Sequence, residues 1–427
     1  MGLRILFLTN LYPPASNGGF EQWCQEMAEG LWARGHQVHV LTSRYAAERI
    51  SQEAGWIRRS LHMEMKFGSR THSIDFFRQR KKHEQENLRI LREVLDDFSP
   101  ELAVIWGMWN LPRSLAAELE RQLPGRVAYY IGDYWPTLPS QHQFFWDSPA
   151  RNWFTRLPKA LLKPFAKRIM MQEVAPELLF ERLLFPSHFM LEEYQRLGME
   201  LKDAQVIAGA IETTLYTRRN GNSAKALPQN ANDNRNQQSF SLLYAGRLSP
   251  EKGIETAIQA MEYLVCQHGL QEVHLAILGG GEHGYVNRLR EMVRVAGLEQ
   301  QVHFQERVEK EAMPEIYRQY DVFLFPSTWK EPFGRVIVEA LASGLAVIGT
   351  ATGGAREILQ PEENALLFTP GDPQDMARQI LRLMNEPDLR DRLVTNGRRT
   401  AVEKFDITRM VDEIEAYLQG MLVREGS

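Results

Sequence analysis

Short apolar runs alternate with longer segments of helical periodicity along most of the chain. In the first half, runs rich in Val, Ile, Leu and aromatic residues cover Leu3–Thr9, Val38–Thr42, Leu102–Trp106, Val127–Ile131, Leu183–Pro186 and Gln205–Ala208. Apolar runs separated by helices are typical of βαβ units, whose parallel strands are buried on both faces of the sheet. The pattern therefore predicts an α/β fold, with these runs as strands.

The same alternation restarts in the second half, after a polar break. Strands are predicted over Ser241–Ala245, Val273–Leu278, Val302–Phe304, Val322–Pro326, Leu345–Gly349 and Ala365–Phe368. Helices are predicted to begin at Gly253, Tyr285, Pro314, Gly334, Asp372 and Pro387. A second Rossmann-like domain follows from this pattern.

Residues 217–239 are polar, rich in Asn and almost without side chains to bury, so we interpret them as a linker. They divide the chain into an N-terminal domain (1–216) and a C-terminal domain (240–405). In the last helix, predicted from Ile407 to Leu422, apolar residues lie three and four positions apart, which requires another element to cover that face.

Length and charge narrow the functional classes. A chain of 427 residues exceeds what one hydrophobic core usually supports, which agrees with two domains. The formal net charge of −4 argues against a nucleic-acid partner, because binding a phosphate backbone needs a basic excess.

Cysteine usage and targeting signals suggest a cytoplasmic protein. Cys24 and Cys266 are far apart in sequence and supply neither a disulfide framework nor a zinc site. The first residues lack the features of a signal peptide and fit a buried strand. The apolar window Val336–Ala355 contains Ser343-Gly344 and three later glycines, so we expect a helix, a turn and a strand there instead of a membrane span.

Two segments are candidates for phosphate binding. Gly18 and Gly19 follow the first strand and open a helix, whose free N–H groups attract anions; a tight turn without a ligand is the alternative. Arg247 and Lys252 lie between a strand end and a helix start, where open α/β sheets bind ligands, although a solvated surface turn would also fit. Two cations and a helix terminus can neutralise a diphosphate, and no Asp-x-Asp element occurs in the chain, so we expect no metal.

Glu331 and Glu339 form the most specific element, within EPFGRVIVE at a helix start. Eight helical residues rise about 12 Å, more than the roughly 5–9.5 Å between the paired carboxylates of a glycoside hydrolase. We therefore expect different roles, with Glu331 near the chemistry and Glu339 accepting hydrogen bonds from a ribose. The alternative is an exposed helix Glu plus a capping acid. Gly281, in the Gly279–Gly281 loop, offers a further close approach to a ligand.

These segments resemble, in order, the signature blocks of the retaining glycosyltransferases with the GT-B fold, family four in the sequence classification, also called glycosyl transferases group 1. The blocks are GGFEQWCQEMAEGLWARGHQVHVLT (18–42), FPSHFMLEEYQRLG (185–198), YAGRLSPEKGIETAIQA (244–260), DVFLFPSTWKEPFGRVIVEALASGLAVIGTATGGAREIL (321–359) and ENALLFTPGDPQDMARQI (363–380). The resemblance implies two Rossmann-like domains facing each other across a cleft. It also implies a final helix (406–427) that crosses back to the N-terminal domain.

The resemblance further implies a nucleotide-sugar donor in the C-terminal domain and an acceptor on the N-terminal domain, with no separate cofactor. By it, Arg247 and Lys252 hold the diphosphate, Glu339 the ribose and Glu331 the sugar hydroxyls. The backbone at Phe333, Gly334 and Arg335, with Gly19, completes the phosphate site, and the base lies near Val308. Retention is explained in this family by attack on the face that the phosphate leaves, with the leaving phosphate taking the acceptor proton.

The chain departs from the family pattern at three places. Many members carry a His-Asp pair after the fourth strand, where this chain has Gly132-Asp133, so we expect Asp133 to take part of the catalytic role. The usual Asn-Gly before the crossover reads Ala208-Gly209-Ala210, and Glu306 replaces a small Gly. Among the histidines, His36 is expected to pack at a turn, and His283 and His142 are the other candidates for the site.

A basic segment suggests how the acceptor is reached. Residues 151–171 carry six cations (Arg151, Arg156, Lys159, Lys163, Lys167 and Arg168) and no acid, interleaved with apolar residues that include Trp153 and Phe154. With the cluster Arg78–Lys82, this segment predicts peripheral docking on the anionic cytoplasmic leaflet, to reach a lipid-linked or cell-surface saccharide. The alternative is a solvated helix whose apolar face packs on the core.

Other functions of the same architecture stay open from the sequence. An epimerase acting on a nucleotide sugar, or a phosphorylase, would share the two-domain fold. A catalytically impaired protein that only binds a nucleotide sugar is the reading that Gly132 motivates.

Overall fold

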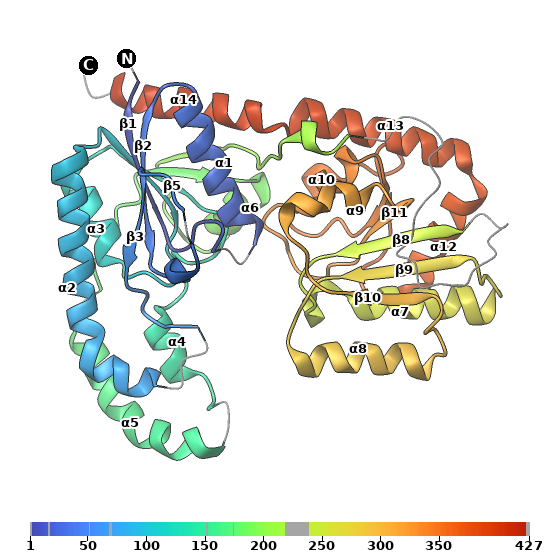
Figure 1. Ribbon diagram of the computed structural model, residues 1–427, viewed down its shortest axis with the longest axis horizontal. Helices are drawn as coiled ribbons and strands as arrows, with labels where there is room; N and C mark the ends of the chain where they lie inside the picture. Colours follow the sequence, from blue (N-terminus) through green and yellow to red (C-terminus); the bar gives the residue numbers. More distant parts are fainter. Residues whose placement is uncertain are drawn as a thin grey trace. The chain divides into compact units, whose positions relative to one another are not determined.

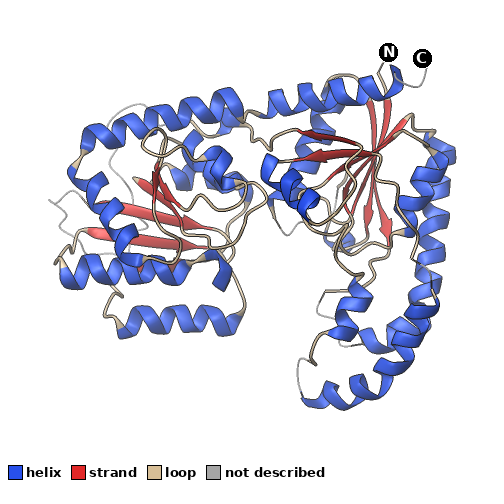
Figure 2. Cartoon of the chain, turned by 180° about the vertical axis from the view of Figure 1, so that it is seen from behind, coloured by secondary structure: helices blue, strands red, loops and turns tan. Residues whose placement is uncertain are grey.

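The computed structural model describes residues 2–15, 18–50, 52–67, 71–150, 153–173, 175–217 and 239–423. It divides into two compact units. Unit 1 comprises residues 1–186, 191–207 and 411–427, and unit 2 comprises residues 187–190 and 208–410. Most of the predicted linker, 218–238, lies outside the described residues. Each unit is a parallel sheet covered by helices on both faces (Figure 2).

Unit 1 contains a seven-stranded sheet in the order β3-β2-β1-β4-β5-β6-β7, with every pair parallel. The strands are β1 (Arg4–Thr9), β2 (Gln37–Ser43), β3 (Ile57–Leu61), β4 (Leu102–Gly107), β5 (Val127–Tyr130), β6 (Arg182–Phe185) and β7 (Asp203–Val206). The helices are α1 (Gly19–Ala33), α2 (His72–Phe98), α3 (Ser114–Gln122), α4 (Gln141–Asp147), α5 (Trp153–Gln172), α6 (His188–Arg196) and the last helix, α14 (Ile407–Val423). In Figure 1, α2 and α3 lie on one side of the strands and α1 on the other.

Two helices extend unit 1 beyond the carboxyl ends of its strands. Helices α4 and α5 pack against the first part of α2 (Figure 1). A small core of Phe76, Trp146 and Ala166 joins the three helices. This arrangement places the loops that follow β3, β4 and β5 beside the first turns of α2.

The turn before β2 fixes the last helix to unit 1. Arg34 pairs with Asp412 and Glu415 on α14, in both cases at 2.6 Å. His36 is buried, accepts a hydrogen bond from the Leu3 amide through Nδ1 at 3.0 Å, and contacts Glu415 through Nε2 at 3.0 Å. His36 therefore has the structural role that the sequence predicts.

Unit 2 contains a six-stranded parallel sheet in the order β10-β9-β8-β11-β12-β13. Its strands are β8 (Phe240–Ala245), β9 (Val273–Leu278), β10 (Val302–Gln305), β11 (Val322–Phe325), β12 (Ala346–Gly349) and β13 (Leu366–Leu367). Its helices are α7 (Ile254–Glu262), α8 (His283–Val295), α9 (Met313–Tyr317), α10 (Arg335–Ala342), α11 (Ala355–Ile358), α12 (Pro373–Asn385) and α13 (Pro387–Lys404). Helices α7 and α8 lie to one side of the sheet and α10 and α13 to the other (Figure 1).

The window 336–355 is the helix, turn and strand that the sequence predicts, since it holds α10 and β12. In the described part of the chain, no helix combines the length and apolar character needed to cross a membrane. The α/β prediction, with two Rossmann-like units, is confirmed.

Candidate functional site

The loop after β8 presents the two predicted phosphate ligands of unit 2. It runs from Gly246 through a 3₁₀ turn, Pro250–Lys252, to the start of α7. Gly253 has φ +70°, and a Cβ there would lie 2.0 Å from the Pro326 carbonyl oxygen. Only glycine fits such a close approach of two backbones. The glycine therefore fixes the loop against the end of β11.

Lys252 and Glu331 meet at this edge of the sheet. The Lys252 ammonium forms an ion pair with Oε1 of Glu331, and their side chains are only 20% and 12% exposed. The Ser327 hydroxyl donates to the same carboxylate oxygen at 2.9 Å. An ammonium carries three N–H donors, so Lys252 retains capacity for a ligand beside Glu331.

Arg247 projects from the same loop into solvent. Its side chain is 70% exposed, and its guanidinium lies 3.7 Å from Glu251. The carbonyl oxygen of Arg247 accepts a hydrogen bond from the Tyr244 hydroxyl at 2.8 Å, which holds the backbone while the side chain stays accessible. The structure thus places Arg247, Lys252 and Glu331 at the carboxyl ends of the neighbouring strands β8 and β11.

Two neighbouring glycines, Gly353 and Gly354, support the segment that carries Glu331. The Gly354 amide donates to the Glu331 carbonyl oxygen at 2.6 Å. Gly353 has φ +61°, and a Cβ there would lie 2.4 Å from the same oxygen. The loop after β12 is consequently packed against the backbone of Glu331, and side chains at these positions would displace it.

Glu339 lies two turns inside α10 and is buried. Its Oε1 is 3.0 Å from Nε of Arg335, and its Oε2 accepts from the Tyr317 hydroxyl at 3.1 Å. A carboxylate oxygen accepts more than one hydrogen bond, so these contacts leave acceptor capacity. An exposed Glu339 with a capping Glu331, the alternative interpretation, is wrong, because Glu339 is 6% exposed and Glu331 is paired with Lys252.

The start of α10 brings the other predicted phosphate residues together. Gly334 is the N-cap, with φ +114°. Phe333 is buried, with its ring 5.6 Å from that of Phe405. The Arg335 side chain is buried beside Glu339, so the backbone of this helix start is the part near Glu331.

The remaining predicted residues of unit 2 are less closely placed. Gly281 is exposed, and a Cβ there would lie 2.0 Å from the Leu248 carbonyl oxygen. This glycine therefore serves a contact within the chain, whereas its ligand role stays a prediction. Val308 is partly buried beyond the end of β10, and His283 is exposed at the start of α8.

The predicted residues of unit 1 surround the start of α1. Gly18 is the N-cap of α1, and its amide donates to the Glu21 carboxylate at 3.0 Å. Asp133 follows β5, and its Oδ1 accepts from the Trp135 amide at 3.1 Å. Burial, together with the nearby Glu21 carboxylate, raises the pKa of Asp133 to about 7. Glu21 thus occupies the predicted anion-binding helix start in the described structure.

The space beside Gly132, where many family members carry a histidine, is occupied by a side chain of another element, α1. A Cβ on Gly132 would lie 2.3 Å from the Phe20 ring. That ring packs on Trp106 and Tyr130, at 5.8 and 6.2 Å between centroids. The aromatic ring of Phe20 explains why glycine stands at position 132.

Sequence reasoning missed several residues of these sites. Ser327 contacts Glu331 from four residues earlier in the same loop, and Tyr317 contacts Glu339 from 22 residues away, where no spacing pattern points to it. Glu21 was accessible to such reasoning, because an acid three residues after an N-cap is a known capping signal.

In the described ranges, His, Cys, Asp and Glu side chains form no group of three or more that could hold a metal ion.

Two family models cover most of the chain. Residues 18–209 match a glycosyl transferase 4-like domain, and residues 228–400 match glycosyl transferases group 1. Mannosylfructose-phosphate synthase of Agrobacterium fabrum is 31% identical over 185 residues, which are 42% of this chain and 40% of that protein. The chain spans less than half the length of the first curated relatives it matches.

Solved structures share the fold along the whole chain. Sucrose-phosphate synthase of Thermosynechococcus elongatus is similar with a TM-score of 0.71 and 19% identity, covering 98% of this chain and 99% of that one. HepE of Anabaena in complex with UDP-glucose gives 0.65 and 18% identity, covering 98% and 100%. The two Rossmann-like units and these structural neighbours define the class: the chain has the GT-B fold. It belongs to the glycosyl transferases group 1 family.

Proposed function

We propose that the chain is a retaining, metal-independent hexosyltransferase that moves a sugar from a nucleotide-diphosphate sugar to a saccharide or lipid-linked acceptor. The observation that carries this proposal is the cluster of Lys252, Glu331 and Arg247 beside the start of α10. Relatives and structural neighbours include a mannosylfructose-phosphate synthase and a protein solved with UDP-glucose, which support a nucleotide-sugar donor.

In the proposed mechanism, fixed protein charges neutralise the leaving diphosphate. Each charge–charge contact at 4 Å contributes up to about 4 kcal/mol at an effective dielectric near 20, before desolvation. Lys252 is already oriented by Glu331, so it loses little side-chain freedom when the donor binds. Glu331 accepts hydrogen bonds from the sugar hydroxyls, and Glu339 accepts from the ribose. Asp133 assists from unit 1, where the family histidine is absent.

Retention follows in this proposal from attack on the face that the diphosphate leaves. The leaving phosphate oxygen takes the acceptor proton, so no protein base is required. The proton NMR coupling of the anomeric hydrogen in the first-formed product reports the configuration. We expect the α configuration of an α-linked donor to be kept, and inversion would refute this part of the proposal.

Turnover tests the activity itself. Release of nucleotide from a panel of UDP-, GDP- and ADP-sugars is measured with acceptor extracts for the wild type, Glu331→Gln and Glu362→Gln. Glu362 is exposed, pairs with Arg382 elsewhere in unit 2 and serves as a matched control. We expect turnover to fall at least about 100-fold in Glu331→Gln, which corresponds to about 2.7 kcal/mol, and to stay unchanged in the control. Equal rates in all three proteins would refute the enzymatic role.

We further propose that α5 docks unit 1 on an anionic membrane surface. Leu157, Leu161 and Phe165 recur every four residues and are 68%, 63% and 66% exposed. Ala166 on the opposite face is fully buried. The predicted alternative, a helix whose apolar face packs on the core, thus applies to only one face of α5. A second apolar face, formed by these three side chains, is exposed.

The cations around the exposed row of Leu157, Leu161 and Phe165 differ in how accessible they are to a ligand. Lys163 and Lys167 flank it beside Asp147, and Arg156 and Arg168 are exposed. Lys159 is buried and donates to the Phe145 and Ser148 carbonyl oxygens, so it is not a surface charge. Arg151 and the side chains of Trp153 and Phe154 lie outside the described residues.

The second basic cluster contributes less than the sequence suggests. Arg80 is bound by both carboxylate oxygens of Glu173, and Lys81 lies 3.5 Å from Glu173.

Co-sedimentation with vesicles tests the docking. We expect binding to phosphatidylglycerol vesicles, not to phosphatidylcholine vesicles, and loss of binding in Leu161→Glu/Phe165→Glu. Val295→Glu, a change at a residue 72% exposed in unit 2, is the control. No preference for the anionic vesicles would refute the docking.

A further inference from the structure

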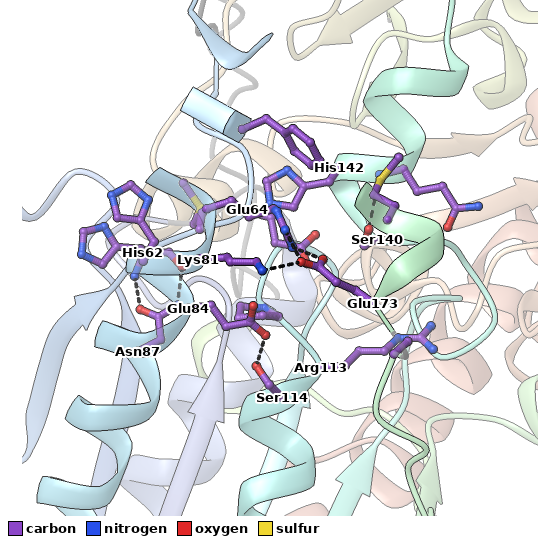
Figure 3. A pocket seen from close by; sticks show the side chains of 18 of the residues that line it. His62, Glu64, Lys81, Glu84, Asn87, Arg113, Ser114, Ser140, His142 and Glu173 are labelled. Atoms are coloured by element: carbon purple, nitrogen blue, oxygen red, sulfur yellow. Dashed lines mark hydrogen bonds and ion pairs between the residues drawn. The ribbon is translucent and has the colours of Figure 1, made fainter. Parts of the chain in front are cut away.

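The loops after β3, β4 and β5 border a cavity of about 980 Å³ in unit 1. Its walls include parts of 62–66 after β3, 112–114 after β4 and 136–143 after β5. Figure 3 shows Arg113 among the side chains that line it. The loop after β5 also carries Asp133, the residue of unit 1 that the proposed mechanism uses. The contacts that hold this loop therefore decide where the Asp133 carboxyl group lies.

The Arg113 side chain bonds to the middle of the loop after β5. Its Nη2 donates to the backbone carbonyl oxygens of Trp135, Pro136 and Leu138, at 3.2, 2.9 and 2.9 Å. A guanidinium is planar and presents its N–H donors in a fixed arrangement. One side chain from the loop after β4 thus fixes the backbone of the neighbouring loop at three residues.

Trp135 links Arg113 to Asp133. The Trp135 amide donates to Oδ1 of Asp133 at 3.1 Å, and the Trp135 carbonyl oxygen accepts from Arg113 at 3.2 Å. The indole is 4% exposed and packs near the rings of Tyr129 and Phe180, at 6.2 and 5.8 Å between centroids. Both polar groups of the Trp135 backbone are therefore bonded, one to each side chain, so a shift at Arg113 reaches Asp133.

Arg113 itself stands on well-anchored backbone. It is the N-cap of α3, and the next residue, Ser114, donates its hydroxyl to Glu84 of α2 at 2.7 Å (Figure 3). The fully buried Asn110 side chain accepts from the Met65 amide at 2.9 Å and donates to the Met65 carbonyl oxygen at 2.7 Å. The loop after β4 is thus tied to α2 and to the loop after β3, which gives the guanidinium a fixed origin.

The charge of Arg113 requires the contacts that it makes with the loop. Burial lowers the pKa of Arg113, and the nearby Glu64 carboxylate opposes that effect. Burial also raises the pKa of Glu64 to about 7, so Glu64 neutralises Arg113 only in part at neutral pH. A partly desolvated cation is unfavourable unless its N–H groups are bonded. The three carbonyl oxygens supply these bonds, and the cation and the loop therefore stabilise each other.

We propose that Arg113 is a positioning residue for Asp133, holding its carboxyl group in place for sugar transfer through the backbone of the loop after β5. The inference rests on the proposed function, in which Asp133 assists the reaction. Two further groups surround Asp133: the Glu21 carboxylate of α1, and the Tyr194 hydroxyl of α6, which donates to the Asp133 carbonyl oxygen at 2.8 Å.

The pKa of Asp133 distinguishes positioning by Arg113 from a simple effect of its charge. This pKa, about 7 in the wild type, is measured by NMR of isotope-labelled aspartate carboxyl groups, with Asp133→Asn for assignment. Loss of a positive charge alone would raise the pKa or leave it unchanged. Release of the loop admits water, which lowers the pKa toward the ordinary value of about 4.

We expect the pKa of Asp133 to fall to about 6 or below in Arg113→Met. It should fall less far in Arg113→Lys, which keeps the charge but not the planar arrangement of donors. Arg44→Met is the control, because Arg44 donates to the Ser60 carbonyl oxygen from Nε and Nη2, at 3.3 and 2.9 Å, outside the loop after β5. The control should keep the wild-type pKa.

Melting curves establish which variants fold, and Arg113→Lys decides alone if Arg113→Met does not fold. An unchanged or raised pKa of Asp133 in the folded Arg113 variants would overturn the inference.

Turnover separates the inference from the proposed function. Nucleotide release is measured from UDP-glucose, GDP-mannose and ADP-glucose with acceptor extracts. We expect Arg113→Met to lower kcat about tenfold or more and to leave the donor KM within about twofold, because the proposed diphosphate ligands lie in unit 2. In an Asp133→Asn background the same change should lower kcat less than about twofold.

Equal losses of kcat in the two backgrounds would show that Arg113 does not act through Asp133. Absence of turnover in the wild type would refute the proposed function, whereas the NMR titration would still decide whether Arg113 positions Asp133.

Discussion

At the scale of single residues, Gly132 shows how a departure from a family pattern has a local cause. The Phe20 ring fills the space where a side chain at 132 would stand, and it packs on Trp106 and Tyr130. The sequence shows the glycine but not its neighbour, because 112 positions separate the two residues. The loss of the histidine is therefore tied to the aromatic core of unit 1.

A double-mutant cycle at this contact tests that explanation. We expect Gly132→Ala to destabilise the chain by about 1–3 kcal/mol, since it overpacks the site against Phe20. In Phe20→Ala the same glycine change should cost at least about 1 kcal/mol less. Gly55→Ala, in open space, should change the free energy of unfolding by less than about 0.5 kcal/mol. Urea unfolding measures all four variants, and additive effects would show that Phe20 does not constrain position 132.

Asp133 predicts a pH dependence of stability. Because its folded pKa is raised to about 7, the folded chain keeps a proton that the unfolded chain releases near pH 4. The stabilisation from this proton is complete below about pH 4 and is lost as the pH rises through 7. Asn mimics the protonated form, so we expect Asp133→Asn to be more stable than the wild type by about 1–3 kcal/mol at pH 8, with the gap closing near pH 4.

Urea unfolding across this pH range measures the gap between Asp133→Asn and the wild type. The exposed Asp97→Asn is the comparison, and it should show no such divergence between pH 5 and 8. A constant difference for Asp133→Asn would mean that Asp133 is ionised throughout.

At the scale of elements, the loop after β12 supports the segment that carries Glu331. We expect Gly353→Ala to lower the free energy of unfolding by more than the backbone strain alone would, because its Cβ would meet the Glu331 backbone at 2.4 Å. Gly371→Ala is matched, with φ +80° and no atom within 4 Å, and it should cost about 1–2 kcal/mol.

Thermal unfolding and nucleotide binding together measure this support. Gly353→Ala should exceed Gly371→Ala by a further 1–3 kcal/mol or so from overpacking, and it should weaken nucleotide binding, which Gly371→Ala leaves intact. If the two variants behave alike, the loop does not position Glu331.

Strand patterns could be predicted where strands are buried and not where they lie at an edge. The central strands β1 and β4 are almost wholly buried apolar runs and were predicted within one residue at each end. Strand β3, with sequence IRRSL, was missed, because an edge strand with two arginines lacks the apolar signal. Strand β7 begins at Asp203, two residues before its prediction, since its polar start is typical of a sheet edge.

At the scale of the whole molecule, the two Rossmann-like units and the cations of unit 2 could be predicted from the sequence. Each depends on residues that are close together along the chain. The loop with Arg247 and Lys252 is continuous in sequence, so its position after a strand is readable. Contacts such as Lys252 with Glu331, and the cavity of unit 1, join segments far apart in sequence. These contacts depend on the packing of strand ends, which periodicity does not encode.

The central claim is that fixed cations, without a metal ion, bind the donor diphosphate. Calorimetric affinity for the nucleotide sugar that most stabilises the chain tests this most directly, with the wild type, Arg247→Ala, Lys252→Ala and Arg294→Ala in EDTA. Arg294, exposed and paired with Glu291, is the control. We expect EDTA to leave wild-type affinity unchanged within about twofold. Each of the two site variants should bind about 10–100-fold more weakly, and the control as the wild type. Binding that is abolished by EDTA and restored by a divalent cation, or wild-type affinity in both site variants, would contradict the account.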